Sequence, residues 1–271
     1  MSAGRLARYA TALADRALVG TTAGDYRLVR LLGQGRYGSC FEVEALGGTD
    51  AAERLGETRA VAKLIKAGRR GIDSDAVWAE CAAFSLLQDC GANVPCWLGI
   101  VHDAPGARLR RRYFIIESFC EGRSIERRLA RRERFSDEVV ASVGAQLISL
   151  SERMAARGVV HGDIRPANVL LSDDGAVSLI DFGLAHFFDR AIEERERLSA
   201  SAVDIEGIAE TMLFMLYSDP KRIGFAGASW QEELDIAASQ KEFLSDAFFR
   251  PDAFRSFSTM RRRFAEAFGT S

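Results

Sequence analysis

The chain has 271 residues, a length that suits one large core or the two lobes of a single catalytic unit. It is 48% hydrophobic and 27% charged with only 5 Pro, which indicates a globular protein without a long disordered tail. The net charge of −2 gives no overall reason to expect a nucleic-acid partner, and no apolar run approaches the roughly 18 residues of a membrane span.

Cysteine usage favours a reducing compartment. The five cysteines are Cys40, Cys81, Cys90, Cys96 and Cys120. Their number is odd and none has C-x-x-C spacing, which argues against a disulfide framework or a zinc site. Charged residues interrupt Met1–Gly20, so no secretory signal is expected there. We therefore expect a cytoplasmic protein, with delivery into a host cytosol as an effector left as an open alternative.

The first part of the chain is typical of a small, mainly β lobe. Residues 1–25 are expected to form an extension with a short amphipathic helix, whose apolar residues at helical spacing are Leu6, Tyr9, Leu13 and Ala17. One helix is expected from about residue 75 to 88, capped by Asp73 or Ser74. Strands are expected at residues 26–32, 41–43, 60–65, 98–101 and 113–117, with a polar connection at 46–58.

From residue 120 onward the pattern becomes helical. Ser136 is a good N-cap and Gly158 a good C-terminal stop, so together they bracket a long helix. Asp204 opens another helix, and weaker helical signals continue to Phe268. We therefore expect a first lobe at 26–119, a second at 120–271, and a single catalytic domain at 26–265.

A glycine motif lies between the first two expected strands of this lobe. Gly33, Gly35 and Gly38 form a G-x-G-x-x-G pattern, which is a weak signal alone because glycines also serve ordinary hairpin turns. Its place between two strands argues against a dinucleotide-binding fold, where a helix follows the motif. A glycine-rich hairpin instead lets backbone N–H groups approach nucleotide phosphates.

A lysine and a glutamate follow the glycine motif at positions that suit phosphate binding. Lys63 lies on the third expected strand among apolar neighbours, where a lysine can also simply extend to water. The functional alternative is an ammonium held against the α- and β-phosphates by a carboxylate from the next helix. Glu80 is the candidate for that carboxylate, one turn before Phe84 on the expected inner face.

The stretch His161–Asn168, followed by Asp181-Phe182-Gly183, carries the most chemical information. Metal-assisted phosphoryl transfer needs one carboxylate at the acceptor hydroxyl, plus an amide and a second carboxylate that hold Mg²⁺. Asp163 is the candidate for the catalytic base, although an Asp in a turn can also merely cap backbone groups. Asn168 and Asp181 are the candidate metal ligands, because Mg²⁺ prefers hard oxygen donors.

Three further side chains near this stretch have more limited roles. Arg165 can reach a transferring phosphate and offset its developing charge. His161 is expected to be structural because apolar residues surround it, and Asp204 is expected to anchor the backbone of the catalytic loop.

In the order and spacing of these motifs, the chain resembles the eukaryotic-like protein kinase superfamily over residues 26–265. The resemblance implies an α+β, two-lobed fold, with a small N-terminal β-sheet lobe containing one helix and a reduced, mainly α-helical C-terminal lobe. It implies ATP and Mg²⁺ as cofactors, with ATP in the cleft. The adenine would lie near Cys40, Val61 and Leu170, and the hinge backbone would be Glu117 to Phe119.

The chain departs from the common kinase pattern in its regulatory parts. Gly162 stands where many kinases have an Arg that pairs with a phosphorylated activation loop. The short segment from Asp181 to Asp204 contains no Pro, so an Ala-Pro-Glu element is missing, and Arg165 replaces the usual Lys. These features predict a minimal kinase with constitutive activity.

The expected function is transfer of the γ-phosphate of ATP to Ser or Thr hydroxyls of a protein substrate, with an activating partner protein as a further expectation. A small-molecule kinase of the aminoglycoside or choline type is an alternative, because Gly162 is common there. Those enzymes usually carry a large helical insertion, whereas the chain between Glu117 and Asp163 has room for two helices and little more. A pseudokinase that only binds partners is a further alternative, although every charged group that the chemistry needs is present.

Overall fold

The computed structural model describes most of the chain. The described residues are 13–34, 38–55, 59–65, 67–68, 71–72, 74–88, 90–91, 93–103, 112–224, 227 and 229–269. They fall into two compact units: the first reaches Cys81 and takes in Pro95–Phe119, and the second contains Ala82–Val94 and the chain from Cys120 onward. The limits expected for the two lobes and for a single catalytic domain stay predictions.

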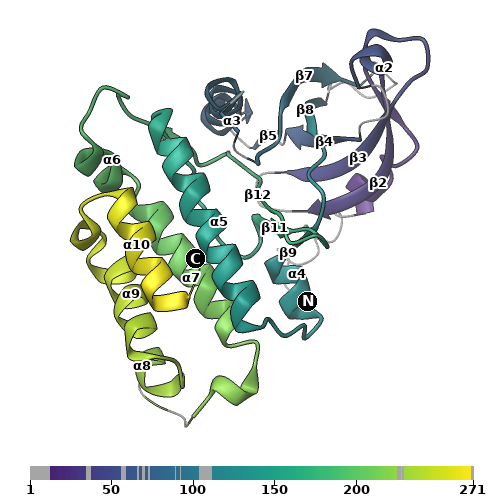
Figure 1. Cartoon of the computed structure of the whole chain (residues 1–271). Helices are drawn as coiled ribbons and strands as arrows, with labels where there is room; N and C mark the ends of the chain where they lie inside the picture. Colours follow the sequence, from purple (N-terminus) through teal and green to yellow (C-terminus); the bar gives the residue numbers. More distant parts are fainter. Residues whose placement is uncertain are drawn as a thin grey trace. The chain divides into compact units, whose positions relative to one another are not determined.

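The first unit is built on a six-stranded antiparallel sheet in the order β1-β2-β3-β4-β8-β7 (Figure 1). Its strands are β1 (Thr22–Ala23), β2 (Tyr26–Gln34), β3 (Ser39–Ala45), β4 (Ala60–Ile65), β7 (Trp97–His102) and β8 (Tyr113–Ser118). The strands predicted at 26–32, 41–43, 60–65, 98–101 and 113–117 are present, whereas the two-residue β1 is too short to show a pattern. A separate hairpin joins β5 (Ala67–Gly68) to β6 (Gly71–Ile72).

Alternation along the strands gives this sheet two different faces. One face is covered by a hydrophobic cluster, whose buried members include Leu18, Leu28, Phe41, Val43, Ala51, Ala62 and Leu64. The other face carries Cys40, Val61 and Lys63, because Cys40 lies directly opposite Lys63 and Val61 precedes Lys63 by two residues. The residues predicted for nucleotide binding on these two strands therefore share one face.

The connection predicted at 46–58 does join β3 to β4, but it is not polar throughout. Helix α2 (Asp50–Leu55) occupies part of it, and its side chains Ala51 and Leu55 are buried in the hydrophobic cluster. The hydroxyl of Thr49 accepts the backbone N–H of Ala52 at 3.3 Å and so caps the first turn of the helix. A helix this short offers too few positions for a recognisable period.

The N-terminal segment buries a different face from the one predicted. Residues 13–16 are helical, but the buried side chains there are Asp15, 6% exposed, and Leu18, 5% exposed. Leu13 is 51% exposed and Ala17 is exposed as well, because the helix ends before Ala17 and the chain turns. The remaining residues of the predicted apolar face, Leu6 and Tyr9, lie outside the described residues.

Helix α3 (Ser74–Leu87) confirms the helix predicted from about residue 75 to 88. The division between the two units falls within it, after Cys81. Glu80 and Phe84 are both 2% exposed and lie one turn apart on its buried face, as their spacing predicted.

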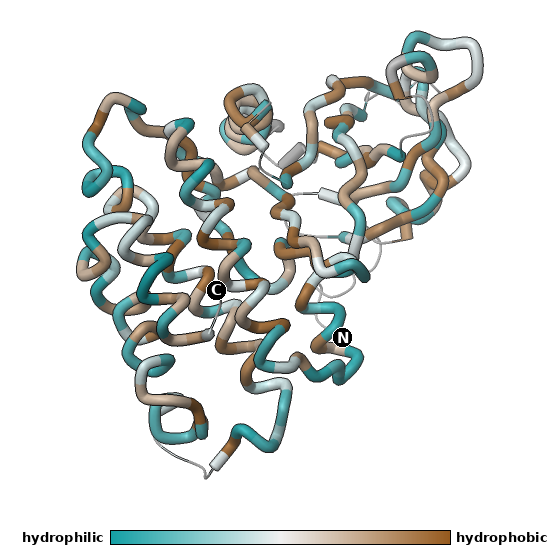
Figure 2. The backbone as a smooth tube through the Cα atoms, in the orientation of Figure 1, coloured by the Kyte–Doolittle hydropathy of each residue, from teal (hydrophilic) through white to brown (hydrophobic). Residues whose placement is uncertain are grey.

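The second unit is mainly helical. Its helices are α4 (Ile125–Ala130), α5 (Asp137–Ala156), α6 (Glu194–Ala200), α7 (Ala202–Leu216), α8 (Trp230–Glu233), α9 (Ala238–Phe249), α10 (Phe257–Phe268) and the short 3-10 turns η1 (Pro220–Arg222) and η2 (Pro251–Phe254). Helix α5 packs against α7 and α10, and α9 packs against the same two helices (Figure 1). Hydrophobic and hydrophilic stretches alternate along these helices (Figure 2), as one-sided burial requires.

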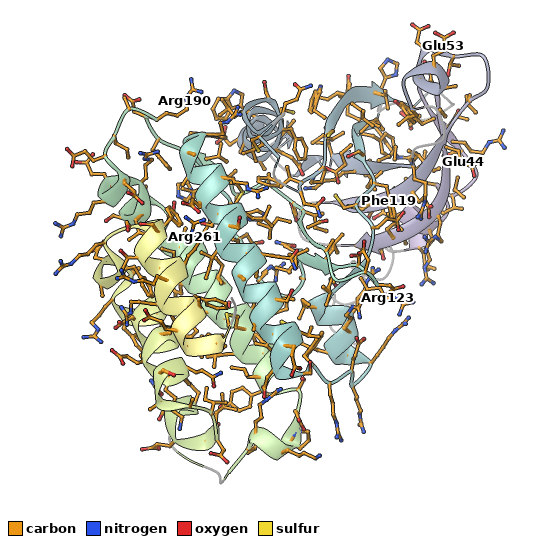
Figure 3. The ribbon with its side chains drawn as sticks, in the orientation of Figure 1. Glu44, Glu53, Phe119, Arg123, Arg190 and Arg261 are labelled. Carbon is orange, nitrogen blue, oxygen red and sulfur yellow. The ribbon has the colours of Figure 1, made fainter. Side chains whose placement is uncertain are left out.

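Helix α5 begins and ends where the sequence predicted. The hydroxyl of Ser136 accepts the N–H of Val139 at 3.3 Å, and Gly158 follows the helix with a left-handed φ of 71°. Arg261 of α10, labelled in Figure 3, reaches Glu152 of α5 at 3.4 Å. Among the described residues, no helix has the length and apolar character that crossing a bilayer requires.

Short strands in the second unit hold its loops in place. They are β9 (Arg123–Ser124), β10 (Val159–Val160), β11 (Val169–Leu171), β12 (Val177–Leu179) and β13 (His186–Phe187). Strands β12, β11 and β9 form one antiparallel sheet, and β10 pairs with β13. These pairs fix both ends of the Asp-Phe-Gly segment.

Candidate active site

A buried ion pair in the first unit joins Lys63 of β4 to Glu80 of α3. The ammonium nitrogen of Lys63 lies 2.7 Å from Oε1 and 3.0 Å from Oε2 of Glu80. The two side chains are only 8% and 3% exposed. Charges this deeply buried are tolerated when they are paired at close range, so the pair fixes the position of the ammonium.

The glycine motif begins in the ladder between β2 and β3, and its last glycine, Gly38, directly precedes β3. Gly33 pairs with Cys40 there, whereas Gly35 lies outside the described residues. A Cβ added at Gly38 would overlap the carbonyl oxygen of Leu64 on β4. Gly38 is therefore required for strand packing, in addition to the role predicted for it at a phosphate.

Val61 and Phe119 occupy the strand ends where the adenine was expected. Val61 lies directly opposite Glu117 in the β4–β8 ladder. The backbone N–H of Phe119 donates to the carbonyl of Arg59 at 3.0 Å, and the Arg59 guanidinium lies 3.7 Å from the centre of the Phe119 ring (Figure 3 labels Phe119). A base that used this N–H would have to displace the carbonyl of Arg59, and no sequence pattern predicted that contact.

In the second unit, the loop before β11 brings three predicted site residues together. Oδ2 of Asp163 accepts hydrogen bonds from the Asn168 amide at 2.8 Å and from Nε of Arg165 at 3.2 Å. The same amide nitrogen donates to the Asp163 carbonyl at 2.9 Å. Because its nitrogen is engaged by Asp163, the amide oxygen of Asn168 is the atom that a metal ion would contact.

The hairpin β11–β12 brings Asp181 next to Asn168. Val169 pairs with Leu179, and the N–H of Ile180 donates to the Asn168 carbonyl at 3.1 Å, so the ladder continues to the hairpin base. Asp181 follows with a left-handed φ of 70°, which Asp tolerates better than most side chains. The hairpin therefore places Asp181 one residue beyond the backbone hydrogen bond to Asn168.

These oxygen donors fit magnesium. Mg²⁺ is usually held by one or two carboxylates together with substrate phosphates, and an amide oxygen is an equally hard donor. Asn168 and Asp181 supply one donor of each kind from the base of one hairpin. Leu170 lies on β11 between Ser124 and Ser178 of the neighbouring strands, where its side chain is half-buried.

His161 has the structural role predicted for it. The ring is fully buried: Nδ1 accepts the N–H of Asp163 at 3.2 Å, and Nε2 lies 3.2 Å from the carbonyl of Ile180. These partners select the neutral tautomer with hydrogen on Nε2. Its ring centroid lies 4.5 Å from that of Phe182, which in turn packs against Phe84 at 5.7 Å as predicted.

Asp204 of α7 anchors the catalytic loop, which confirms the prediction for this residue. Its Oδ2 accepts the N–H of His161 at 2.9 Å, and its Oδ1 accepts the N–H of Gly162 at 2.8 Å. Burial raises the pKa of the Asp204 carboxyl to about 6, against the opposing effect of these two hydrogen bonds.

The raised pKa of Asp204 predicts a stability that depends on pH. Because the folded-state pKa lies above the ordinary 3.8, the contribution of this group is complete below about pH 3.8 and is lost as pH rises through about 6. Asp204→Asn removes this titration and leaves one backbone N–H without an acceptor, at a cost of about 1–3 kcal/mol. Urea unfolding of both proteins between pH 4 and 7.5 should show the stability advantage of the wild type shrinking with rising pH; a constant advantage would contradict the assignment.

Gly162 is required by the backbone. Its φ is 76°, and a Cβ there would overlap the carbonyl oxygen of Leu184 and lie 3.3 Å from Nδ1 of His186. The adjacent pair Val160–His186 holds the same two segments together in the β10–β13 ladder. The sequence indicated only a missing Arg, whereas the structure shows that no residue with a side chain fits at this position.

A groove in the second unit begins beside the catalytic loop and was not predicted. Its volume is about 380 Å³, and its lining residues are Glu126, Leu129, Arg165, Pro166, Ala167, Glu210 and Phe214. Phe214 is 49% exposed on α7. A large apolar side chain on the exposed face of a helix can mark a binding groove. The sequence alone did not reveal this for Phe214, because the buried face of α7 has to be known first.

A lysine–glutamate pair in a β unit and an Asp-x₄-Asn loop with an Asp-Phe-Gly hairpin in a helical unit define the class of kinase-like phosphotransferases. Residues 26–205 match the family model described as the protein kinase domain. This chain belongs to the protein kinase domain family.

Curated relatives carry the same domain. The chain is similar to a protein named "Probable serine/threonine-protein kinase YbdM" from Bacillus subtilis, 34% identical over 126 residues, or 46% of this chain and 48% of the relative. It is 27% identical over 191 residues to human "Ribosomal protein S6 kinase alpha-4", covering 70% of this chain and 23% of the relative. Rice "CBL-interacting protein kinase 4" is 32% identical over 166 residues, or 60% of this chain and 33% of the relative. The chain thus spans half or less of the length of these relatives.

Proposed function

We propose that this chain is a protein kinase that transfers the γ-phosphoryl group of ATP to Ser or Thr hydroxyls of a protein substrate. The observation that carries the proposal is the cluster of Asp163, Arg165 and Asn168 at the base of the hairpin that leads to Asp181. Asn168 and Arg165 both donate hydrogen bonds to Oδ2 of Asp163. Oδ1 then accepts the proton of the acceptor hydroxyl.

The other site residues have roles that follow from charge. The Lys63 ammonium, held by Glu80, binds the α- and β-phosphates of the nucleotide. Asn168 and Asp181 would hold Mg²⁺, which when bound neutralises phosphate charge. The side chain of Arg165 is 51% exposed, so its guanidinium is able to reach the transferred phosphoryl group while Nε stays on Asp163.

The groove beside Arg165 supports a polypeptide as the substrate. Its carboxylates Glu126 and Glu210 suit a basic side chain, and Leu129 with Phe214 suits an apolar one. A small polar alcohol or amine would leave these apolar side chains in contact with water. Residues 120–160 are described without gaps, and the helices in this range are α4 and α5. This range therefore contains no large helical insertion of the kind that binds a small acceptor.

The segment between Asp-Phe-Gly and Asp204 supports activity without a phosphorylation switch. Its two hydroxyl residues are Ser199 and Ser201. Ser201 is 1% exposed and donates to the Arg197 carbonyl at 3.0 Å. Ser199 donates to Oδ1 of Asp252 at 2.5 Å, so a phosphate on Ser199 would face a carboxylate.

Replacing Ser199 and Ser201 together by Ala is therefore expected to leave the phosphotransfer rate within about twofold of the wild type, because neither hydroxyl bonds to a residue of the proposed site. The matched variant Ser199→Glu places a second carboxylate at Asp252 and should lower the melting temperature. Initial rates with labelled ATP and thermal melts measure both effects. A large loss of rate in the Ala variant would show that a phosphoserine activates the enzyme.

The proposed function is tested by incubating the protein with labelled ATP and Mg²⁺, first with lysates of source and candidate host cells, then with a panel of aminoglycosides, choline and other small alcohols and amines. Phosphosites identified by mass spectrometry on Ser or Thr support the proposal, and labelled small molecules alone would contradict it. An activating partner is indicated if the purified protein is slow on a purified substrate and lysate restores the rate. Asp163→Asn serves as the inactive control in each arm.

A further inference from the structure

A buried carboxylate from the N-terminal segment binds both strands that flank the glycine motif. Oδ2 of Asp15 accepts a hydrogen bond from the Ser39 hydroxyl at 2.5 Å and one from the Gln34 amide at 3.3 Å. Asp15 is 6% exposed and Ser39 is fully buried. Gln34 directly follows Gly33, and Ser39 directly follows Gly38. One oxygen atom thus links the strand on which the motif begins to the strand on which it ends.

The linked residues form the last pair of the β2–β3 ladder. Gln34 lies directly opposite Ser39, one step beyond the pair Gly33–Cys40. The ladder is irregular just before this point, with a register shift between Leu31 and Gly33. Ladder hydrogen bonds therefore specify the base of the glycine hairpin only weakly, and a charged acceptor shared by both strands adds the missing constraint.

Asp15 is itself held firmly in the first unit. Leu18, one turn later, is buried in the hydrophobic cluster. The N–H of Gly20 donates to the Leu28 carbonyl at 2.7 Å, and the N–H of Leu28 donates to the Thr21 carbonyl at 2.9 Å. Beyond these bonds, β1 pairs with β2. The segment that carries Asp15 is consequently part of the sheet's hydrogen-bond network.

The carboxylate acts from the face of the sheet away from the predicted nucleotide residues. Ser39 and Phe41 are two residues apart on β3, so Ser39 shares the face of the hydrophobic cluster. Cys40 and Lys63 point to the opposite face. Asp15 therefore does not contact a nucleotide bound at Lys63, and its negative charge stays on the far side of the sheet.

We propose that Asp15 is a positioning residue for nucleotide binding. By fixing the spacing of Gln34 and Ser39, it orders the base of the glycine hairpin before the phosphates arrive and so lowers the entropy lost on binding. The N-terminal segment therefore contributes to phosphate binding, although it does not touch the nucleotide. This inference rests on the proposed function, because it assumes that the glycine motif binds the phosphates of ATP.

The test compares a ligand that has phosphates with one that lacks them. Calorimetry measures the Kd of Mg·ATP and of adenosine for the wild type, Asp15→Ala and Asp15→Asn. Asp15→Ala is expected to weaken ATP binding about tenfold, or 1.4 kcal/mol, and to leave adenosine binding unchanged. Asp15→Asn keeps an oxygen acceptor for both donors and should recover most of the ATP affinity. A purely structural role would change both ligands alike.

A double-mutant cycle connects the effect to the Ser39 bond. If Asp15 acts through Ser39, Asp15→Ala adds little to the ATP defect of Ser39→Ala. Should Asp15→Ala fail to fold, Ser39→Ala and Gln34→Ala provide the same comparison with smaller changes. An unaltered ratio of ATP to adenosine affinity in folded variants overturns the inference while the proposed function stands. A wild-type protein that binds no ATP overturns the proposed function itself.

Discussion

Asp163→Asn is expected to lower kcat by about 10²- to 10⁴-fold, the usual contribution of a general base. Both hydrogen bonds to the Asp163 side chain end on Oδ2, from Asn168 and Arg165. An asparagine whose amide oxygen takes the place of Oδ2 keeps both bonds, while the nitrogen at the other position cannot accept a proton. Only the chemistry of Oδ1 is thus removed.

The measurement separates chemistry from binding and folding. The Kd for ATP and the melting temperature of Asp163→Asn should match those of the wild type, because the loop keeps its hydrogen bonds. A variant with full phosphotransfer activity would show that Asp163 does not handle the proton. A variant without enzymatic activity that retains its biological effect would instead favour the pseudokinase alternative.

Lys63→Met is expected to abolish most phosphotransfer and to destabilise the fold. The variant leaves the carboxylate of Glu80, which is 3% exposed, without its ammonium partner. Breaking a buried pair in this way typically costs about 3–5 kcal/mol. Losing the cation that binds the phosphates should reduce kcat/KM by about 10²- to 10³-fold, as for other groups that stabilise developing charge.

The double variant Lys63→Met with Glu80→Leu distinguishes the two effects. It removes both charges from the buried pair, so the free energy of unfolding measured in urea should return close to the wild-type value. Activity should remain lost, since the phosphates still lack their cation. If the double variant regained activity, the ion pair would serve stability alone, and the role proposed for Lys63 would be wrong.

Local sequence signals predicted the parts of the fold that local chemistry determines. Ser136 and Gly158 marked the ends of α5 because a cap and a left-handed stop act on their own helix. An apolar run located β4, and the spacing of Glu80 and Phe84 predicted the buried face of α3. The prediction of a two-lobed α+β fold of the kinase type agrees with the sheet unit, the helical unit and the family match.

Tertiary contacts determine what the sequence did not show. Asp15 was interpreted as a charge that interrupts an apolar stretch, but it is buried because Ser39 and Gln34 supply hydrogen bonds from distant strands. Helix α2 exists because Ala51 and Leu55 find a place in the cluster. In each case the partner lies far along the chain, and residue spacing alone does not identify it.

The sequence predicted which residues form the candidate site, but only some of the contacts between them. The pairing of Lys63 with Glu80 was predicted and is confirmed, whereas the hydrogen bond between Asp163 and Asn168 was not predicted from their spacing. Their roles in catalysis, and those of the residues expected around the adenine, stay predictions. The engagement of the Phe119 N–H by Arg59 was not foreseeable, because it depends on how two strand ends align.

The close approach of Gly162 to Leu184 restricts how this enzyme is able to evolve. The obstructing atom is a carbonyl oxygen, which every amino acid has, so no substitution at position 184 creates room for a larger residue at 162. An ancestor or descendant with arginine there would need a different path for the whole segment. Gaining the arginine that pairs with a phosphorylated segment in many kinases would therefore require the backbones at 162 and 184 to separate first.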